Sequence, residues 1–377
     1  MSKLISTLTV GMAAAVATLL TTVYAQETTS TDEKKLLEVP ASNFMVRPFK
    51  VSDFQMEIGL LSAFFLYFLL WSRGKSTNMT RANHWLQGQI EYFQQQFALV
   101  GDNKSNKLVK DGPADFLLYT TGRRNVQFGH WWFKMKKRND MLTLFTTTVL
   151  SKFTSTKPSV DRMDVTLQLD KNLPEKFVFA VIRKDLAADL HKKRFDLNRV
   201  GKIASSKLLS DEYNVYAETQ KLADTILTTT KMTEWLKNKA PGRLEHLILS
   251  SLPAEEPIMY DNDNHMSLSL SFLMPEGKDV DTLDPFVELA CQIPDVLQQL
   301  RLPADVKTKI NKNREDLLKE FSKKKAADRA EELAKKKAEA KRAEEERIKK
   351  LSPAEQRKWE EKERARTMKK QMKRRKV

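Results

Sequence analysis

The chain has 377 residues, of which 65 are Lys or Arg and 49 are Asp or Glu, so its net charge at neutral pH is +16. This length, with 41% hydrophobic residues, suffices for the packed cores of one or two domains and argues against wholesale disorder. A strongly basic protein is attracted to polyanions such as RNA, DNA or acidic membranes. The single cysteine, Cys291, excludes an intramolecular disulfide framework and any metal site built from several thiolates.

The positive charge is concentrated at the C-terminal end of the chain. Residues 301–377 hold 29 Lys and Arg against 15 Asp and Glu, a net charge of +14. The first 300 residues hold 36 against 34, a net charge of +2. The chain is therefore a nearly neutral body followed by a basic tail, and only the tail requires a polyanionic partner.

Residues 1–25 have the three parts of a secretory signal peptide. Lys3 precedes an apolar run from Val10 to Leu20, and the small residues around Val23 and Ala25 form a site suited to signal peptidase. We expect cleavage after Ala25, with an uncleaved anchor as the alternative.

A second apolar stretch, from Phe54 to Trp71, predicts a single transmembrane helix. Its 18 residues would span about 27 Å as a helix, close to the lower limit for crossing a bilayer. A buried core helix is the alternative, but Arg73 and Lys75 directly after Trp71 are typical of a membrane boundary. The anchor residues that we expect are Phe54, Ile58, Leu61, Phe65, Tyr67, Phe68 and Trp71.

The order of these two segments predicts how the chain is oriented. Residues 26–53 would form a short luminal segment and residues 72–377 would remain in the cytosol, so the N-terminus is luminal and the C-terminus cytosolic. The glycosylation sequons at Asn78 and Asn103 then lie on the cytosolic side, where we expect them to be unused.

The body, residues 76–302, has the pattern of a mixed α+β domain with a substantially antiparallel sheet. Helices are expected over residues 80–99, 185–195 and 218–238, and from Asp284-Pro285 onward, where Asp can cap a helix and Pro suits its first turn. Strands are expected over residues 115–121, 126–128, 141–150, 163–169, 176–182, 212–217, 244–249 and 266–273.

The body contains no recognisable catalytic or metal-binding motif. Its five histidines are scattered without paired spacing, and no nucleophile elbow, Walker loop or dinucleotide fingerprint is present. The segment from Asp261 to His265 begins like a calcium loop, but Met266 stands where glycine is required. We therefore expect a protein without enzymatic activity and without a bound cofactor.

One aromatic and basic run in the body is a candidate interaction surface. It comprises Trp131, Trp132, Lys134, Lys136, Lys137 and Arg138. The favoured interpretation is a set of aromatic core residues beside a solvated basic turn. The alternative is a contact with the membrane interface or with an RNA backbone.

The tail, residues 303–377, is rich in Ala, Glu, Lys and Arg, contains no glycine, and predicts a long solvated helix. Glu331 and Lys335 stand in the favourable i,i+4 order, whereas apolar residues such as Leu333 are too sparse for a regular coiled-coil seam. Ser352-Pro353 should break this helix and begin another.

The end of the tail is the candidate RNA-binding site. No acidic residue follows Glu363, and eight basic residues follow it within thirteen positions: Arg364, Arg366, Lys369, Lys370, Lys373, Arg374, Arg375 and Lys376. Phosphates of an RNA backbone are the partner that we expect, because the arm would carry this charge far from the membrane anchor. The alternative is a membrane-anchored tether whose tail binds anionic lipid.

Three segments together resemble one protein family. They are VRPFKVSDFQMEI at residues 46–58, GHWWFKMKKRNDML at residues 129–142 and KWEEKERARTMKKQMKRRK at residues 358–376. They are similar to the coiled-coil-domain-containing protein 47 family, also called calumin, and the likeness covers essentially residues 40–377.

The resemblance implies a non-enzymatic membrane protein of the endoplasmic reticulum, in an intramembrane chaperone complex beside the Sec translocon. The implied partners are an Asterix-like small membrane protein, the translocon, the ribosome with its RNA, and nascent multi-pass proteins whose insertion is assisted. It also implies that residues 54–71 form the anchor and Arg364–Lys376 the ribosome-facing end. Animal members carry a long acidic luminal segment linked to calcium. Here residues 26–53 are short and mixed in charge, so calcium storage is not expected.

Overall fold

The computed structural model describes residues 54–102, 107–153, 159–205, 208–258, 260, 265–275, 283–349 and 353–375. The signal peptide and luminal segment expected over residues 1–53 lie outside the described residues, and so do Asn103 and Lys376.

The centre of the fold is one ten-stranded sheet in which neighbouring strands run antiparallel. The strand order is β1-β3-β4-β5-β10-β9-β6-β8-β7, and β2 pairs with β3. The strands are β1 (Leu99–Val100), β2 (Val109–Lys110), β3 (Asp115–Arg123), β4 (Val126–Lys134), β5 (Arg162–Leu169), β6 (Val178–Arg183), β7 (Lys202–Ala204), β8 (Tyr213–Ala217), β9 (Leu244–Ser250) and β10 (Ser267–Leu273). The expected combination of helices with an antiparallel sheet is confirmed.

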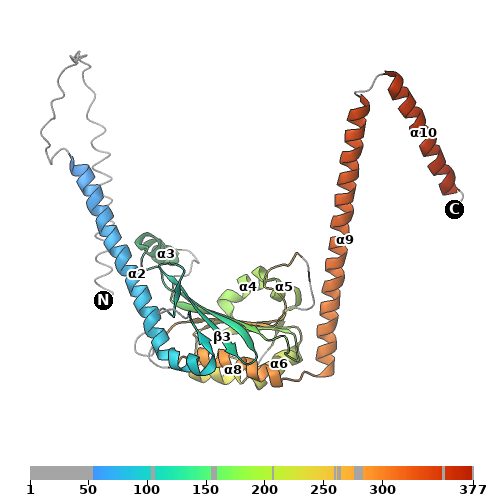
Figure 1. The fold of residues 1–377 in the computed structure, drawn as a ribbon. Helices are drawn as coiled ribbons and strands as arrows, with labels where there is room; N and C mark the ends of the chain where they lie inside the picture. The colour runs from blue at the N-terminus through green and yellow to red at the C-terminus, as the bar shows by residue number, and fades with distance from the viewer. Residues whose placement is uncertain are drawn as a thin grey trace, which may run out of the picture.

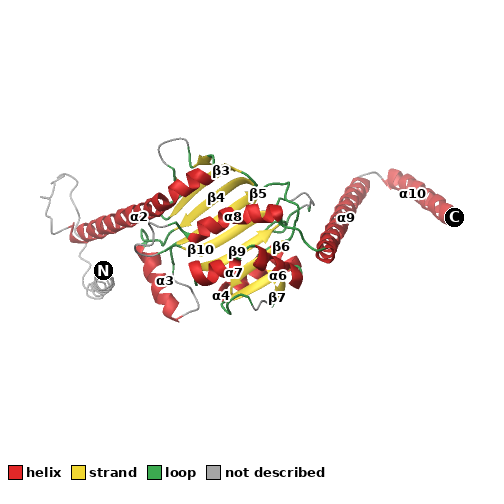
Figure 2. Ribbon diagram, turned by 90° about the horizontal axis from the view of Figure 1, so that it is seen from below, coloured by secondary structure: helices red, strands yellow, loops and turns green. Residues whose placement is uncertain are grey.

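Helices cover both faces of this sheet. Seen from below, α6, α7, α8 and one end of α2 cover one face (Figure 2). Helices α4 and α5 lie on the opposite face (Figure 1). The helices are α2 (Gln55–Gln96), α3 (Met141–Phe153), α4 (Lys184–Lys193), α5 (Phe195–Val200), α6 (Gln220–Thr229), α7 (Met232–Glu234), a π-helix (Trp235–Lys239), α8 (Pro285–Gln299), α9 (Ala304–Lys349) and α10 (Pro353–Arg375).

The larger core lies between the sheet and the helices α2, α6 and α8. Alternate residues of β4 point into it, so the rings of Trp131 and Phe133 are fully buried. Trp131 meets Phe93 of α2 edge to face at 4.8 Å, and Phe133 meets Trp85 of α2 at 5.3 Å. A smaller core on the opposite face joins β6 and β9 to α4, α5 and the base of α9.

Helix α8 begins as its sequence predicts. The Asp284 carboxylate accepts a hydrogen bond from the backbone N–H of Phe286 at 3.1 Å, and Pro285 occupies the first turn. The Asp284 backbone N–H also donates to the side chain of Gln89 at 2.8 Å, which ties α8 to α2.

The strand expected over residues 141–150 is wrong, because this segment forms helix α3. Its threonine-rich composition suggested a strand. Asp140 instead caps a helix, since its carboxylate accepts a hydrogen bond from the Thr143 backbone N–H at 3.0 Å. The Thr147 hydroxyl then donates to the Thr143 carbonyl at 2.7 Å, one turn earlier.

Three expected helices also differ from the structure in their bounds. The helix expected over residues 218–238 is divided, because Lys231 adopts a left-handed conformation with φ of 50° between α6 and α7. The helices expected over residues 54–71 and 80–99 are one continuous helix, the 42-residue α2.

Helix α2 changes its surroundings at Gly74. Its buried residues are Gly74, Asn78, Ala82, Trp85, Leu86, Gln89 and Phe93, which form one face of the second half of the helix. A Cβ atom on Gly74 would lie 2.2 Å from the carbonyl oxygen of Arg138. The helix therefore needs glycine here to lie against the backbone that leads from β4 to α3.

We expect Gly74→Ala to lower the free energy of unfolding by about 1–3 kcal/mol, because the clashing atoms are backbone atoms. The matched control is Gly59→Ala on the same helix, where a Cβ meets nothing within 4 Å. The measurement is thermal unfolding of the full chain in detergent micelles. Equal stability of the two variants would contradict the close approach at Gly74.

Candidate membrane and polyanion-binding surfaces

The first half of α2 is an apolar helix whose side chains are largely exposed. Among the described residues it is the one helix long and apolar enough to cross a membrane, and none of its 18-residue apolar window is buried. Leu60 and Phe64 are 69% and 70% exposed. Of the predicted anchor residues, Phe54, Ile58, Leu61, Phe65 and Phe68 are exposed, and Tyr67 and Trp71 are partly covered.

Two aromatic residues and one lysine mark the end of this apolar half. The rings of Phe68 and Trp71 stack at 5.9 Å, and the Lys75 ammonium lies 4.9 Å from the centre of the Trp71 ring. Such an arrangement is typical of the boundary between lipid and water.

Directly beyond this boundary, Asp161 joins α2 to the sheet. Its carboxylate forms a bidentate ion pair with Arg138, with both N–O distances 2.7 Å, and a further ion pair with Arg81 of α2 at 3.1 Å. Burial acts to raise the pKa of Asp161, but the hydrogen bonds from Arg138 and from the Lys136 backbone outweigh burial and hold that pKa below its usual value. We call this group of contacts the Asp161 clamp.

Asn78 of α2 completes the Asp161 clamp. Its fully buried amide donates to the carbonyl oxygens of Pro113 at 3.2 Å and Lys136 at 3.1 Å, and accepts from Arg138 at 3.0 Å. The folded chain therefore leaves no room for a glycan on Asn78.

The aromatic and basic run of β4 does not form one surface. Trp131 is buried and donates its indole N–H to the Thr120 hydroxyl at 3.0 Å. Lys134 lies on the opposite face of the sheet and pairs with Asp164 at 3.0 Å, while Arg138 belongs to the Asp161 clamp. The remaining members are Trp132 and Lys136, which are partly exposed, and Lys137, which is exposed.

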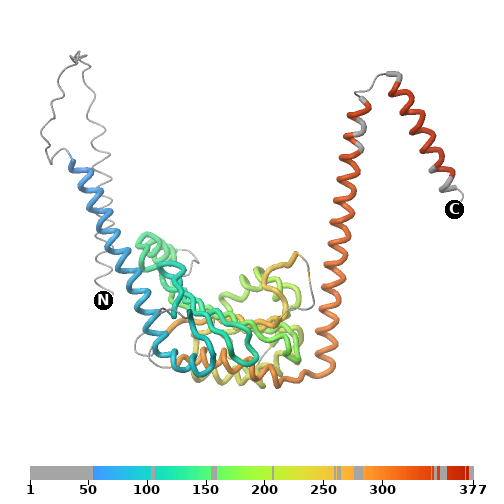
Figure 3. The backbone as a smooth tube through the Cα atoms, in the orientation of Figure 1, coloured from blue at the N-terminus to red at the C-terminus, as the bar shows by residue number. Residues whose placement is uncertain are grey.

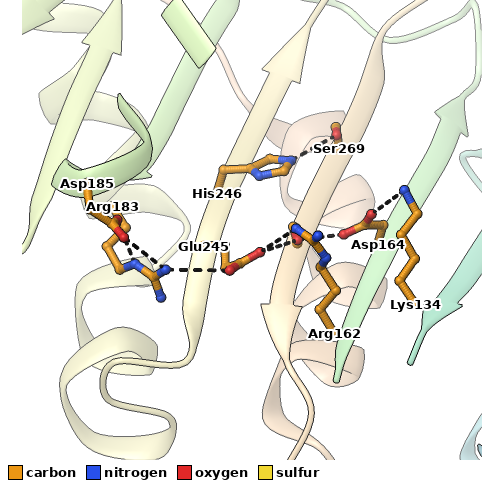
Figure 4. A network of polar contacts seen from close by, with 9 residues as sticks. Lys134, Arg162, Asp164, Arg183, Asp185, Glu245, His246 and Ser269 are labelled. Carbon is orange, nitrogen blue, oxygen red and sulfur yellow. Dashed lines mark hydrogen bonds and ion pairs between the residues drawn. The ribbon is translucent and has the colours of Figure 1, made fainter. Parts of the chain in front are cut away.

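Charged side chains form a network across the sheet face that α4 and α5 share (Figure 4). Glu245 of β9 lies 3.5 Å from both Arg162 of β5 and Arg183 of β6. The Ser271 hydroxyl of β10 bridges Glu245, at 3.2 Å, and Asp164, at 2.6 Å. The network couples neighbouring strands through polar contacts on a face where the sheet is only partly covered.

A buried ion pair anchors the base of α9. Arg314 lies 2.7 Å from Glu218, and the two side chains are only 8% and 0% exposed. Glu218 also accepts hydrogen bonds from the Val178 backbone at 3.0 Å and from Asn313 at 2.7 Å. The apolar residues Val306, Ile310 and Leu317 are buried at helical spacing on the same side.

Beyond Lys324, which pairs with Glu256 of the body at 2.9 Å, α9 leaves the body. Residues 322–340 are all exposed, and the pairs Lys335–Glu331 and Lys336–Glu332 are formed at 2.7 Å each. Figure 3 shows this part of α9 standing clear of the sheet.

The basic end of the tail lies on α10. Of the eight predicted RNA-binding residues, Arg364, Arg366 and Lys369 have exposed side chains, and Lys370, Lys373, Arg374 and Arg375 lie on the same helix. Lys376 is outside the described residues.

The direction of α9 differs from the expectation that the tail carries its charge far from the membrane anchor. The apolar half of α2 and the free half of α9 leave the sheet on the same side (Figure 1). The tail therefore does not carry its charge away from the side that holds the apolar helix, and proximity no longer disfavours a lipid partner.

Comparison with known proteins decides the family. The model of the family described as PAT complex subunit CCDC47 matches residues 53–370, from the apolar half of α2 to the basic end of α10. This chain belongs to that family. The resemblance noted in the sequence is thereby confirmed.

Relatives of the chain come from fungi, animals and plants. The UPF0674 endoplasmic reticulum membrane protein C2G5.01 of Schizosaccharomyces pombe is 30% identical over 54% of this chain and 56% of its own length. The PAT complex subunit CCDC47 of Danio rerio is 26% identical over 74% of this chain and 60% of its own length. An uncharacterized protein of Arabidopsis thaliana is 24% identical over 64% and 50%. The chain thus spans about half to three fifths of the relatives' lengths.

Two features of these CCDC47-family surfaces escaped the sequence interpretation. The network around Glu245 joins residues that are far apart in the chain, so no local sequence pattern predicts it. The outward apolar side of α3 was hidden by the strand interpretation, although Leu142, Phe145, Val149 and Phe153 recur at helical spacing.

We expect Glu218→Gln to destabilise the base of α9 by about 3 kcal/mol, because Arg314 would lose its counter-charge in a buried place. The measurement is limited proteolysis of the full chain, with cleavage at Arg314 and Lys319 rising in the variant. Glu331→Gln is the control, since its exposed pair with Lys335 is screened by water. Cleavage equal in both variants would contradict an anchoring role for the buried pair.

Acid should destabilise the body through His246 of β9. Burial lowers its pKa to about 4, against the opposing effect of Asp164, so the imidazole is neutral in the fold. Because the unfolded chain binds this proton near pH 6.5, stability is lost as pH falls from about 6.5 to about 4, by roughly 3 kcal/mol. His246→Gln should reduce this loss in unfolding measured at pH 7 and pH 4.5. An identical loss in the variant would show that other groups cause it.

Proposed function

We propose that the chain is a non-enzymatic membrane protein of the endoplasmic reticulum and a subunit of an intramembrane chaperone complex. Family membership carries this proposal, since the matching family is described as a PAT complex subunit and the fission-yeast relative is named an endoplasmic reticulum membrane protein. Residues 54–71 would cross the membrane once, after a cleaved signal peptide of residues 1–25. The luminal segment, residues 26–53, would then precede a cytosolic body and tail.

The contacts around α2 support a positioning role for the body. Helix α2 runs without interruption from its apolar half into the larger core, and the Asp161 clamp holds it at the crossing. A body fixed in this way keeps one orientation at the membrane. It would sit beside the Sec translocon and an Asterix-like small membrane protein, so that helices of nascent multi-pass proteins enter a protected space.

The basic end of the tail would bind the ribosome. Seven of its eight basic residues lie on α10, and the described side chains among them are exposed. Lys and Arg on one helix can neutralise RNA phosphates without reading sequence. Such contacts would hold the complex at a translating ribosome.

A second candidate is a membrane-anchored tether whose tail binds anionic lipid. The observation in its favour is that α9 rises on the same side of the sheet as the apolar half of α2 (Figure 1). Lipid phosphate and RNA phosphate attract the same side chains, so the partner must be separated by experiment.

The test is the triple variant Arg364→Gln, Arg366→Gln and Lys369→Gln in ribosome co-sedimentation. Each lost phosphate contact should lower the salt dependence of binding, so the slope of log K against log salt should fall by about 2–3. The matched control is Lys335→Gln, Lys336→Gln and Lys337→Gln, which removes equal charge from α9 and should change binding less.

Flotation of the same variants with neutral and anionic vesicles separates the two candidates. Loss of ribosome binding with flotation unchanged supports the ribosome. Loss of flotation on anionic vesicles with ribosome binding unchanged supports the tether. No loss in either assay would contradict any binding role for these residues.

A further inference from the structure

Helix α3 has its apolar side turned away from the protein. Leu142, Phe145, Val149 and Phe153 recur every three or four residues and therefore lie along one side of the helix. Their exposed fractions are 68%, 45%, 37% and 81%. We call these four side chains the α3 stripe.

The opposite side of α3 is partly covered and carries mainly polar residues, together with Met141 and Leu144. Thr143, Thr147 and Ser151 are half-buried, and the hydroxyls of these residues bond to Asp140 or to carbonyls of the helix itself. A helix on the surface of a water-soluble domain has the reverse arrangement, with apolar residues inside and polar residues outside. The α3 stripe therefore needs an apolar medium that the body does not supply.

The start of α3 is fixed beside the end of the apolar half of α2. The backbone of Arg138 and Asn139 lies against Gly74, and Asp140 then caps α3. Gly74 follows Trp71 by three residues, which is about 4.5 Å along a helix. Helix α3 consequently begins at the level where α2 passes from its apolar half to its buried half.

The two helices run crosswise. Figure 1 looks nearly along α3 while showing the length of α2, and Figure 2 shows the length of α3 leading away from α2. If α2 crosses a bilayer, a helix that starts at its boundary and runs crosswise lies along the bilayer surface.

The charge around this boundary is positive. Four basic residues lie on or next to the two helices: Arg73 and Lys75 of α2, Lys137 before α3, and Lys152 near the end of α3. Long lysine side chains can reach from an apolar surface to the headgroups.

We propose that α3 lies in the headgroup region of the bilayer leaflet that α2 leaves at Trp71, with the α3 stripe in contact with lipid acyl chains. This inference rests on the proposed membrane crossing of α2. Helices with one apolar and one polar side bind at the bilayer surface in this manner. The body is then held to the membrane at two points, which fixes its rotation about α2 as well as its distance from the bilayer.

The test uses single cysteines labelled with the fluorophore NBD in the full chain, reconstituted into vesicles of phosphatidylcholine and phosphatidylserine. Native Cys291 is buried and burial raises the pKa of its thiol to about 12, so it should remain unlabelled. The test positions are Phe145→Cys and Val149→Cys. Leu61→Cys reports on α2, and Asn238→Cys, exposed on the π-helix, reports on water.

Nitroxide lipids should quench Phe145→Cys and Val149→Cys at least threefold more than Asn238→Cys, with shallow nitroxides acting best. Aqueous iodide should quench Asn238→Cys most. Iodide quenching at both α3 positions, with Leu61→Cys still quenched by lipid, would overturn the α3 proposal and leave the membrane crossing intact. Iodide quenching at Leu61→Cys as well would overturn both. Protection of the α3 positions from both quenchers would mean that protein covers the stripe, and would overturn the proposal.

A second variant tests the stripe itself. Leu142→Ser, Phe145→Ser and Val149→Ser are combined, and the label is placed at Phe153→Cys. Lipid quenching at this label should fall at least threefold while the melting temperature changes little, because no residue of α3 is buried. Unchanged lipid quenching would show that the α3 stripe does not hold the helix at the membrane.

Discussion

The relation between the apolar helix and the sheet depends on one largely buried carboxylate, that of Asp161, whose side chain is 9% exposed. The Asp161 carboxylate pairs with Arg138, which lies between β4 and α3, and with Arg81 of α2. The backbone of Asp161 continues directly into β5. A buried carboxylate held by two guanidinium groups is stable only while its partners remain in place. Without this group α2 would touch the body mainly through its aromatic face, and the helix could pivot on the sheet. With it, the direction of the apolar half and the plane of the sheet are set together.

The two faces of the sheet differ in what they bury: one carries most of the apolar core and the other carries a polar network. One face is closed by α2, α6 and α8 and carries most of the apolar burial. The other is closed over β6 and β9 by α4 and α5, and also carries the polar network around Glu245 of β9. That second face lies toward the side from which both α2 and α9 emerge (Figure 1). Polar residues there keep the sheet wettable close to an apolar segment.

Local signals predicted much of this fold. The Asp284-Pro285 cap placed α8, alternation of apolar residues placed β10, and short strand-like segments placed β5, β8 and β9. These patterns depend on a few neighbouring residues. The strand prediction for residues 141–150 was wrong because threonine and phenylalanine favour strands, whereas the cap at Asp140 starts a helix there.

The surfaces were harder to predict than the elements. The basic end of the tail and the apolar half of α2 are runs in the sequence, so composition alone finds them. Strand register decides where the side chain of Trp131 points. The side chain of Arg138 is directed by Asp161, which lies 23 residues further along the chain. The direction of α9 is set by the contacts of its base. Such long-range pairings leave no trace in a window of ten residues.

The number of residues in the exposed part of α9 sets both the distance that the helix spans and the direction in which its later side chains point. Each residue of an α-helix adds about 1.5 Å of length and about 100° of rotation. A single insertion into residues 322–340 would therefore turn the side chains at the end of α9 to a different side of the helix axis. A seven-residue insertion would nearly restore that side while lengthening α9 by about 10 Å. Changes of length in this segment therefore keep the direction of those side chains only when they add near-whole turns.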